Sequence, residues 1–177
     1  MLLDVSVLCF YHATMIPPKV QAILDRHGLQ ALEFEPGSTP TVETAAARIG
    51  VAPGQIAKTL LFTGKSGKAV LVVAAGDVRI SSKKLKALCG EKMSMADGEH
   101  TLKLTGFRPG GVCPFGVEGI PVYLDQSLRR WNTVYPAAGN DATGVPIDYE
   151  KLALVTGGIP CQVSEPVQPS DESLQKE

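Results

Sequence analysis

The sequence lacks the features that mark membrane proteins and metalloproteins. No apolar run approaches the roughly 18 residues that a helix needs to cross a bilayer, so we expect no contact with a membrane. The four cysteines, at positions 9, 89, 113 and 161, form no C-x-x-C pair, and the three histidines do not cluster with them. This spacing argues against a zinc site, and we expect neither a metal nor another cofactor.

The sequence also lacks an excess of charge of one sign. Its 17 Lys and Arg residues nearly balance 18 Asp and Glu residues, and the formal net charge is −1. A protein that grips long nucleic acid by itself has a strongly basic surface, so this balance argues against that class. If nucleic acid is the substrate, we expect only a short end of it to be held firmly.

The two ends of the chain differ from the middle in composition. Residues 1–14 are apolar but contain no Lys or Arg, whereas a secretory signal needs a basic start. We therefore expect a cytoplasmic protein whose thiols stay reduced. We expect residues 15–164 to form one domain, residues 1–14 to be a loosely docked arm or to precede a natural start at Met15, and the polar residues 165–177 to be disordered.

Proline, glycine and capping residues divide the chain into short elements. The pattern predicts helices at about residues 17–27, 42–49, 82–89, 99–104 and 149–155. It predicts strands at about residues 31–34, 56–62, 69–74, 91–95, 120–124 and 132–137, with a last short strand after Gly158. Because strands and helices do not alternate regularly, we expect an α+β fold, with a mixed, strongly curved sheet of about six to seven strands and about five surrounding helices.

The segment 106–116 is the most unusual part of the chain, since its eleven residues include four glycines and two prolines. Glycine allows backbone angles that a Cβ forbids, and proline removes backbone freedom. A loop of this composition is rigid, and its bare peptide groups can aim N–H donors at an oxygen of a ligand. A tight structural turn is the alternative interpretation.

Common catalytic motifs are missing, and two side chains remain as candidates. There is no G-x-S-x-G, H-E-x-x-H, P-loop or G-x-G-x-x-G motif. Cys113 lies within the Gly/Pro segment, but no neighbouring base is evident, and a buried apolar role is the alternative. Lys58 interrupts an apolar strand, so its side chain must reach solvent, pair, or point into a cavity where it could hold a phosphate or a polarised carbonyl.

Several segments together resemble one known family. They are residues 42–46, 56–60, 72–77, 104–116, 122–128 and 134–139, and they include the runs Ile56-Ala57-Lys58-Thr59-Leu60 and Tyr135-Pro136-Ala137-Ala138-Gly139. In order and spacing, from about Pro17 to Ser164, they are similar to the YbaK/prolyl-tRNA synthetase-associated editing domain.

The resemblance implies a free-standing enzyme that deacylates wrongly charged aminoacyl-tRNA, above all Cys- or Ala-tRNA(Pro), on the fold expected above. Hydrolysis would be assisted by the substrate, because an aminoacyl ester is already activated and needs no protein nucleophile. The protein would supply orientation and oxyanion stabilisation without a cofactor. The 3′ end of aminoacyl-tRNA is the expected ligand and prolyl-tRNA synthetase a candidate partner, while the oligomeric state stays open.

The resemblance also assigns roles to individual residues. Lys58, Gly106 and Gly110 are the expected catalytic residues. The expected substrate-binding residues are Thr41, Thr59, Pro109, Gly111, Asp125, Gly139 and Asn140. The segment 139–144 differs among relatives with different amino-acid preference, so the choice between alanine, cysteine and serine or threonine stays open.

Two other functions remain as alternatives at this point. The same pocket could bind a small ligand or a partner protein without turnover, since no protein nucleophile can be assembled. The chain could also be an ordinary esterase or amidase that uses Cys113 as its nucleophile. Release of free amino acid from mischarged tRNA favours the editing enzyme, and labelling of Cys113 with loss of activity favours the esterase.

Overall fold

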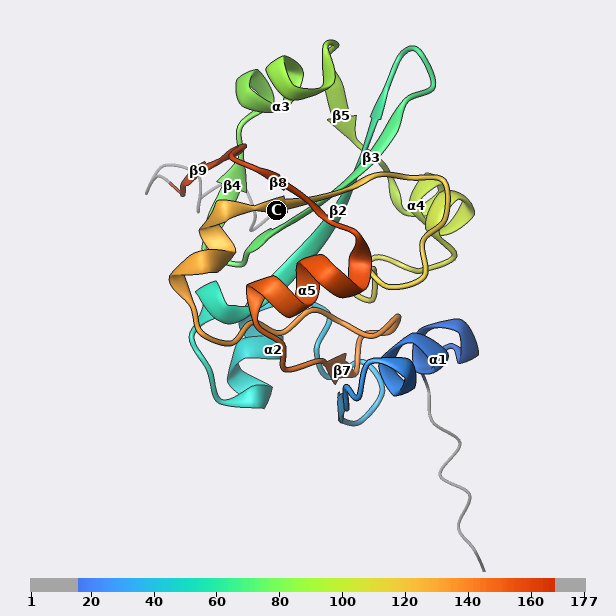
Figure 1. Cartoon of the computed structure of the whole chain (residues 1–177), viewed down its shortest axis with the longest axis vertical. Helices are drawn as coiled ribbons and strands as arrows, with labels where there is room; N and C mark the ends of the chain where they lie inside the picture. The colour runs from blue at the N-terminus through green and yellow to red at the C-terminus, as the bar shows by residue number, and fades with distance from the viewer. Residues whose placement is uncertain (1–15, 168–177) are drawn as a thin grey trace, which may run out of the picture.

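A five-stranded sheet organises residues 16–167, the part of the chain that the computed structural model describes (Figure 1). Its strands, in order across the sheet, are β5 (Met93–Met95), β2 (Ala57–Gly64), β3 (Ala69–Ala75), β6 (Val122–Asp125) and β8 (Ile159–Cys161). β2 runs antiparallel to β3 and β5, whereas β6 runs parallel to β3 and β8. The expected arm, residues 1–14, lies outside the described residues.

Smaller elements surround this sheet. Two-stranded sheets are formed by β1 (Leu32–Glu33) with β7 (Thr143–Gly144), and by β4 (Val78–Ile80) with β9 (Ser164–Pro166). The helices are α1 (Pro18–Arg26), α2 (Val42–Ile49), α3 (Ser82–Cys89), α4 (Gly98–Thr105) and α5 (Tyr149–Thr156), with short 3₁₀ helices η1 (Pro53–Gln55) and η2 (Gln126–Arg130). The predicted α+β class and mixed sheet are confirmed, although the main sheet holds five strands and the others pair separately.

Local capping explains why the helices were predictable. Thr41 begins α2, since its side-chain oxygen accepts a hydrogen bond from the backbone N–H of Thr44 at 3.2 Å. Asp97 caps α4 and Asp148 caps α5 in the same way, each with an N–H to carboxylate distance of 2.8 Å. Each of these interactions lies within one turn, so the sequence pattern alone indicates it.

The two faces of the sheet are covered by different helices. Leu71 and Val73 of β3 pack with residues of α1 and α5 on one face. Side chains alternate along a strand, so Val70 and Val72 point to the other face, where they pack with Leu85 of α3. Residues 70–75 are all buried, which confirms that the apolar run 69–74 is a central strand.

The predicted strand at residues 132–137 is wrong. Val134 and Tyr135 form only isolated bridges, one to Ile147 and the other to Ile56. Pro136 has no N–H to continue a ladder, and the neighbouring residues bond to partners from different segments. The alternation of apolar residues here reflects burial of an irregular segment rather than a strand.

The tail predicted from residue 165 onward is corrected at its start. Glu165 and Pro166 belong to β9, where they pair with Arg79 and Val78 of β4. An ion pair of 2.8 Å between Arg79 and Glu165 accompanies this pairing. Residues 168–177 lie outside the described residues.

Asp125 joins three segments of the fold. Its fully buried carboxylate accepts hydrogen bonds from the backbone N–H groups of Ser127, Val163 and Ser164, at 2.9, 2.7 and 3.0 Å, and from the Ser164 hydroxyl at 2.6 Å. Burial alone would raise the pKa of Asp125, but the hydrogen bonds outweigh it and hold this pKa below its ordinary value. The end of β6 is thereby tied to the segment that leads into β9.

We expect Asp125→Asn to lower the free energy of unfolding at neutral pH by about 2–4 kcal/mol, because buried N–H groups lose a charged acceptor. Because the pKa of Asp125 is lower in the folded than in the unfolded state, its ionised carboxylate stabilises the fold fully at a pH above the unfolded-state pKa of about 4. This stabilisation is lost as the pH falls through the folded-state pKa. Urea unfolding between about pH 7 and 3 should therefore show a smaller loss of stability on acidification in Asp125→Asn than in the wild type. Equal losses in the two proteins would contradict this role.

Candidate functional site

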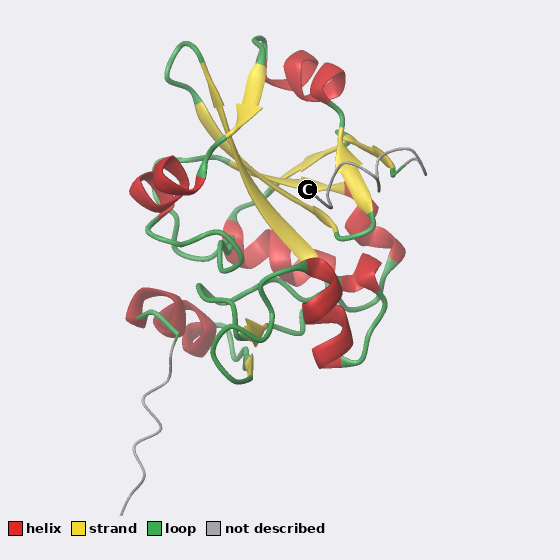
Figure 2. Ribbon diagram, turned by 180° about the vertical axis from the view of Figure 1, so that it is seen from behind, coloured by secondary structure: helices red, strands yellow, loops and turns green. Residues whose placement is uncertain are grey.

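A cavity of about 260 Å³ lies where the end of β2 meets α2 and the loops around it. Figure 2 shows α2 and the neighbouring loops below the long central strands. The cavity is lined by Thr39, Pro40, Thr41, Val42, Ala45, Ile49, Ile56, Ala57, Lys58, Thr59, Leu60, Gly110, Val112, Tyr135, Ala137 and Thr143. Its walls are largely apolar, and neither a carboxylate nor a cysteine is among these lining residues, whose polar groups are hydroxyls, peptide groups and one ammonium.

Lys58 supplies that ammonium. It lies in β2 opposite Ala74 of β3, and its side chain reaches the turn that follows β3. Its Nζ donates hydrogen bonds to the carbonyl oxygens of Gly76, at 3.2 Å, and of Val78. An ammonium carries three N–H donors, so these two acceptors fix its position and leave a third donor for the cavity.

Opposing effects act on the pKa of Lys58. Burial lowers the pKa of Lys58 below its ordinary value, and the carboxylates of Asp77 and Glu43 limit the fall. Arg130 forms an ion pair with Asp77 and thereby fixes this carboxylate near the turn. The Lys58 amino group is therefore held at the cavity wall by backbone carbonyls rather than by a direct ion pair with a carboxylate.

Thr59 and Thr41 also border the cavity, and their hydroxyls differ in whether they already have a hydrogen-bond partner. The Thr59 hydroxyl is buried and has no hydrogen-bond partner within the part of the chain that the structure describes. The Thr41 hydroxyl is already engaged with Thr44 at the start of α2. A buried polar group without a partner is costly, so Thr59 is the better placed of the two to bond a ligand.

The Gly/Pro segment contributes Gly110 to the cavity. Gly110 has φ of +87°, and a Cβ built on it would lie 3.1 Å from the carbonyl oxygen of Pro40. Both the backbone angle and the close approach of the loop before α2 therefore favour glycine here. Gly110 thus lines the cavity with its backbone and without a side chain.

The same loop has a second hollow on its other side. This hollow, of about 340 Å³, is lined by Leu102, Gly106, Phe107, Arg108, Pro109, Gly111, Gly139, Asn140 and Asp141. A Cβ on Gly111 would lie 2.5 Å from the backbone of Asn140, so the two loops pack back to back. Gly106, with φ of +79°, also ends α4.

The structure therefore brings only some of the expected site residues together. Lys58, Thr59, Thr41 and Gly110 line the first cavity. Gly106, Pro109, Gly111, Gly139 and Asn140 line the second hollow. Asp125 lines neither, and its carboxylate is fully occupied by the donors described above.

Sequence analysis missed several residues that line the first cavity. They are Thr39, Pro40, Val42, Ala45, Ile49, Ile56, Ala57, Leu60, Val112, Ala137 and Thr143, together with Tyr135. Tyr135 and Ala137 lie in the run 134–139, and Val42 and Ala45 in the run 42–46; both runs carried the resemblance, which was a usable signal. Ile49 of α2 lies outside these runs and gave no signal, because an apolar helix face is equally typical of an ordinary core.

Cys113 lies outside both spaces. It is fully buried, and its Sγ lies 3.6 Å from the carbonyl oxygen of Phe115. Burial raises the pKa of the Cys113 thiol to about 12, so the thiolate needed for nucleophilic attack does not form near neutral pH. The structure thus favours the apolar interpretation of this residue.

The comparison with protein families decides what kind of domain this is. The aminoacyl-tRNA editing domain model matches residues 36–154, which include both loops and the whole first cavity. The chain belongs to the aminoacyl-tRNA editing domain family. The resemblance stated from the sequence motifs is thereby confirmed.

Individual members of the editing domain family are similar over most of the chain. "Uncharacterized protein YwhH" from Bacillus subtilis is 44% identical over 122 residues, covering 68% of this chain and 77% of the relative. "Putative Cys-tRNA(Pro)/Cys-tRNA(Cys) deacylase EbsC" from Enterococcus faecalis is 28% identical over 120 residues, covering 67% and 73%. "Crystal structure of a putative trans-editing enzyme for prolyl tRNA synthetase" describes a solved structure that is 32% identical, with a TM-score of 0.75 and coverage of 85% of this chain and 99% of that chain.

No helix among residues 16–167 has the length and apolar character needed to span a bilayer. Within the same residues, no group of three or more His, Cys, Asp or Glu side chains is placed to hold a metal ion.

We expect Cys113 to resist iodoacetamide at neutral pH, because a buried thiol with a raised pKa is both inaccessible and protonated. Peptide mapping after labelling, native and unfolded, checks this residue by residue. Cys161, whose pKa burial also raises to about 12, serves as a buried reference. Rapid native labelling of Cys113 alone would revive the esterase alternative.

Proposed function

We propose that this editing domain acts in trans, as a free-standing hydrolase that removes the amino acid from mischarged tRNA, with Cys- or Ala-tRNA(Pro) as substrate. The observation that carries the proposal is the Lys58 ammonium, held by two carbonyls at the wall of a cavity that is also lined by Gly110. The family and the names of the relatives support this substrate class.

The chemistry proposed for the cavity follows from its lining. Because the lining holds no cysteine, and no histidine or carboxylate base that would activate a threonine hydroxyl, we assign the attack to water or to a group of the substrate itself. An aminoacyl ester permits this, since it is already activated. The domain then contributes orientation and electrostatic stabilisation of the developing oxyanion, which are the large terms when no covalent step is used.

We assign roles to the cavity residues on this basis. The free N–H of Lys58 holds the terminal ribose or the adjacent phosphate, and peptide N–H groups near Gly110 face the ester carbonyl. The unpartnered hydroxyl of Thr59 bonds a polar atom of the aminoacyl group. The expected site residues that line the second hollow act indirectly: they fix the shape of the loop that carries Gly110 and thereby position Gly110 next to the substrate. They are Gly106, Pro109, Gly111, Gly139 and Asn140.

The proposal is tested by incubating the protein with Cys-tRNA(Pro), Ala-tRNA(Pro) and correctly charged Pro-tRNA(Pro). We expect release of free cysteine or alanine above the uncatalysed rate, and no release of proline. Binding of all three without release would instead favour the non-catalytic module. Adding prolyl-tRNA synthetase to the same assay shows whether that enzyme is a partner.

We expect Lys58→Met to reduce deacylation by about 10²-fold or more, because the variant keeps the aliphatic stem but loses the charge. The carbonyls of Gly76 and Val78 lose a donor, so the free energy of unfolding should fall by only about 1 kcal/mol. Initial rates and a thermal melt separate the two effects. Activity within a few-fold of the wild type would show that the lysine is not part of the site.

Gly110→Ala and Gly119→Ala form a matched pair. Both residues have a left-handed backbone angle, with φ of +87° and +73°, so each substitution should lower stability by about 1 kcal/mol. Of the two, Gly110 borders the cavity, where the new methyl group pushes against Pro40, whereas Gly119 has open space around it. Deacylation rates normalised to folded protein should fall for Gly110→Ala alone, and equal rates would remove the loop from the site.

A further inference from the structure

One end of the molecule is strongly basic although the chain as a whole carries a net charge of −1. The lysines come from the β2–β3 hairpin, from α3 and from the turn before β5. We call them the basic end; they are Lys65, Lys68, Lys83, Lys84, Lys86 and Lys92, all of them exposed. The one acid in the same segments, residues 64–68 and 82–92, is Glu91.

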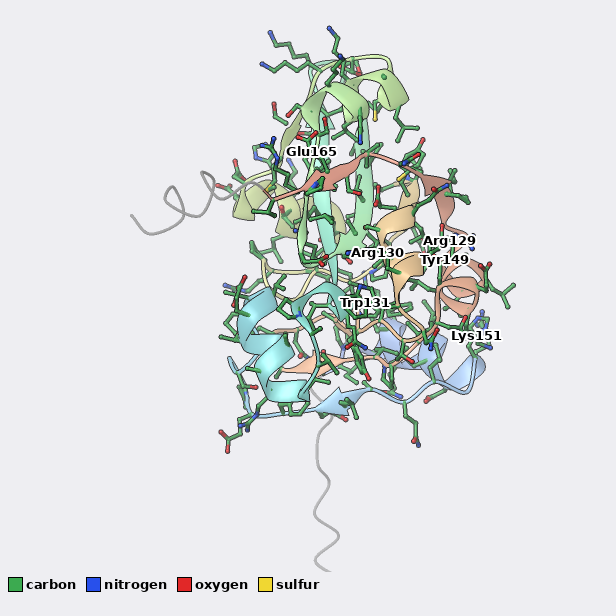
Figure 3. All side chains as sticks on the ribbon, turned by 90° about the vertical axis from the view of Figure 1, so that its left-hand side faces the viewer. Arg129, Arg130, Trp131, Tyr149, Lys151 and Glu165 are labelled. Atoms are coloured by element: carbon green, nitrogen blue, oxygen red, sulfur yellow. The ribbon has the colours of Figure 1, made fainter. Side chains whose placement is uncertain are left out.

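Two contacts hold the segments of the basic end together. The Lys68 ammonium donates a hydrogen bond to the carbonyl oxygen of Cys89 at 2.6 Å, and Glu91 accepts hydrogen bonds from Ser66. The hairpin therefore lies against the end of α3. Figure 3 shows long side chains that end in nitrogen projecting from this end of the molecule.

Most of these lysine side chains have no bonding partner within the described part of the fold. The ammonium groups of Lys68 and Lys84 each donate to a backbone carbonyl, but the side chains of Lys65, Lys83, Lys86 and Lys92 take part in no hydrogen bond or ion pair found there. Leu85 and Cys89 anchor α3 to the sheet. The lysines are therefore not needed to hold α3 in place, and their mutual repulsion disfavours the cluster unless an anion lies nearby.

The basic end lies on the same face of the sheet as Lys58. Side chains alternate along β2, so Lys58, Leu60 and Phe62 point to one face. Phe62 packs there with Leu85 and Cys89 of α3. Phe62 is four positions along β2 from Lys58, so their Cα atoms are about 13 Å apart at the usual rise per residue.

We propose that the basic end binds the phosphate backbone of the tRNA acceptor arm while the 3′ end occupies the cavity. This inference rests on the proposed function and adds a second contact to it. A double-stranded RNA helix is recognised through phosphates and shape rather than base edges, which suits flexible lysines on an exposed helix. A substrate whose single-stranded end leads directly into a duplex can contact both places, with its end at Lys58 and its duplex at α3, farther along β2.

The test compares two double variants that remove the same charge. Lys83→Gln with Lys86→Gln changes the basic end, and Arg26→Gln with Lys151→Gln changes exposed or half-buried positions on α1 and α5. Binding of uncharged tRNA is followed by fluorescence anisotropy between about 50 and 200 mM salt. The slope of log K against log salt should fall by about two for the first variant and stay at the wild-type value for the second.

Hydrolysis of two substrates provides the second measurement. For full-length mischarged tRNA, kcat/KM of the basic-end variant should fall about tenfold at low salt. For an aminoacylated adenosine, a single nucleotide that is too short to reach the basic end from the cavity, the variant should match the wild type. A loss on both substrates would mean that the variant has damaged the cavity and would overturn the inference.

The outcomes separate this inference from the proposed function. If the wild type hydrolyses neither substrate, the proposed function fails, while the salt dependence still tests the basic end. If the wild type hydrolyses both and the basic-end variant has unchanged slope and rates, the inference alone fails. A variant that loses activity only when prolyl-tRNA synthetase is added would also overturn it, since a protein partner would then occupy this surface.

Discussion

The site depends on the hydrogen bonds that hold the Lys58 ammonium against the turn after β3. The register of β2 on β3 places Lys58 opposite Ala74, and the chain turns two residues later, so the carbonyls of Gly76 and Val78 lie within reach. A Cβ on Gly76 would lie 2.2 Å from the carbonyl oxygen of Pro53, so the turn itself is packed tightly against η1. A cation fixed by backbone dipoles in this way needs no reorganisation when a substrate arrives.

The sequence predicted what is local and missed what is not. The bounds of α2 follow from Thr41 and Gly50, which cap it within one turn. The strand predicted at residues 132–137 is wrong because its residues bond to two separate segments, far away in the sequence. The pairing of β9 with β4 was missed for the same reason, since a polar stretch forms a strand only when a distant partner supplies the ladder.

The candidate site shows the same division. Lys58 stood out because a lone lysine in an apolar strand must find a polar partner, and this argument needs no tertiary information. The Gly/Pro segment was recognisable as a rigid loop, but which face each glycine presents depends on what packs behind it. Gly110 faces the first cavity because the neighbouring Gly111 is pressed against Asn140. Asp125 entered only through the resemblance, and its environment is that of a buried structural carboxylate.

Charge is where composition and structure diverge most. Net charge is a sum over the chain, whereas a phosphate responds to charges within a Debye length, about 10 Å at moderate salt. A net charge near zero therefore argues against strong binding along a whole nucleic acid, but it is compatible with a local concentration of lysines. In this fold the β2–β3 hairpin and α3 collect such lysines on the face that also carries Lys58. On the proposed function, Lys58 and the basic end are two local contacts to one tRNA, on a chain whose net charge gives little long-range attraction.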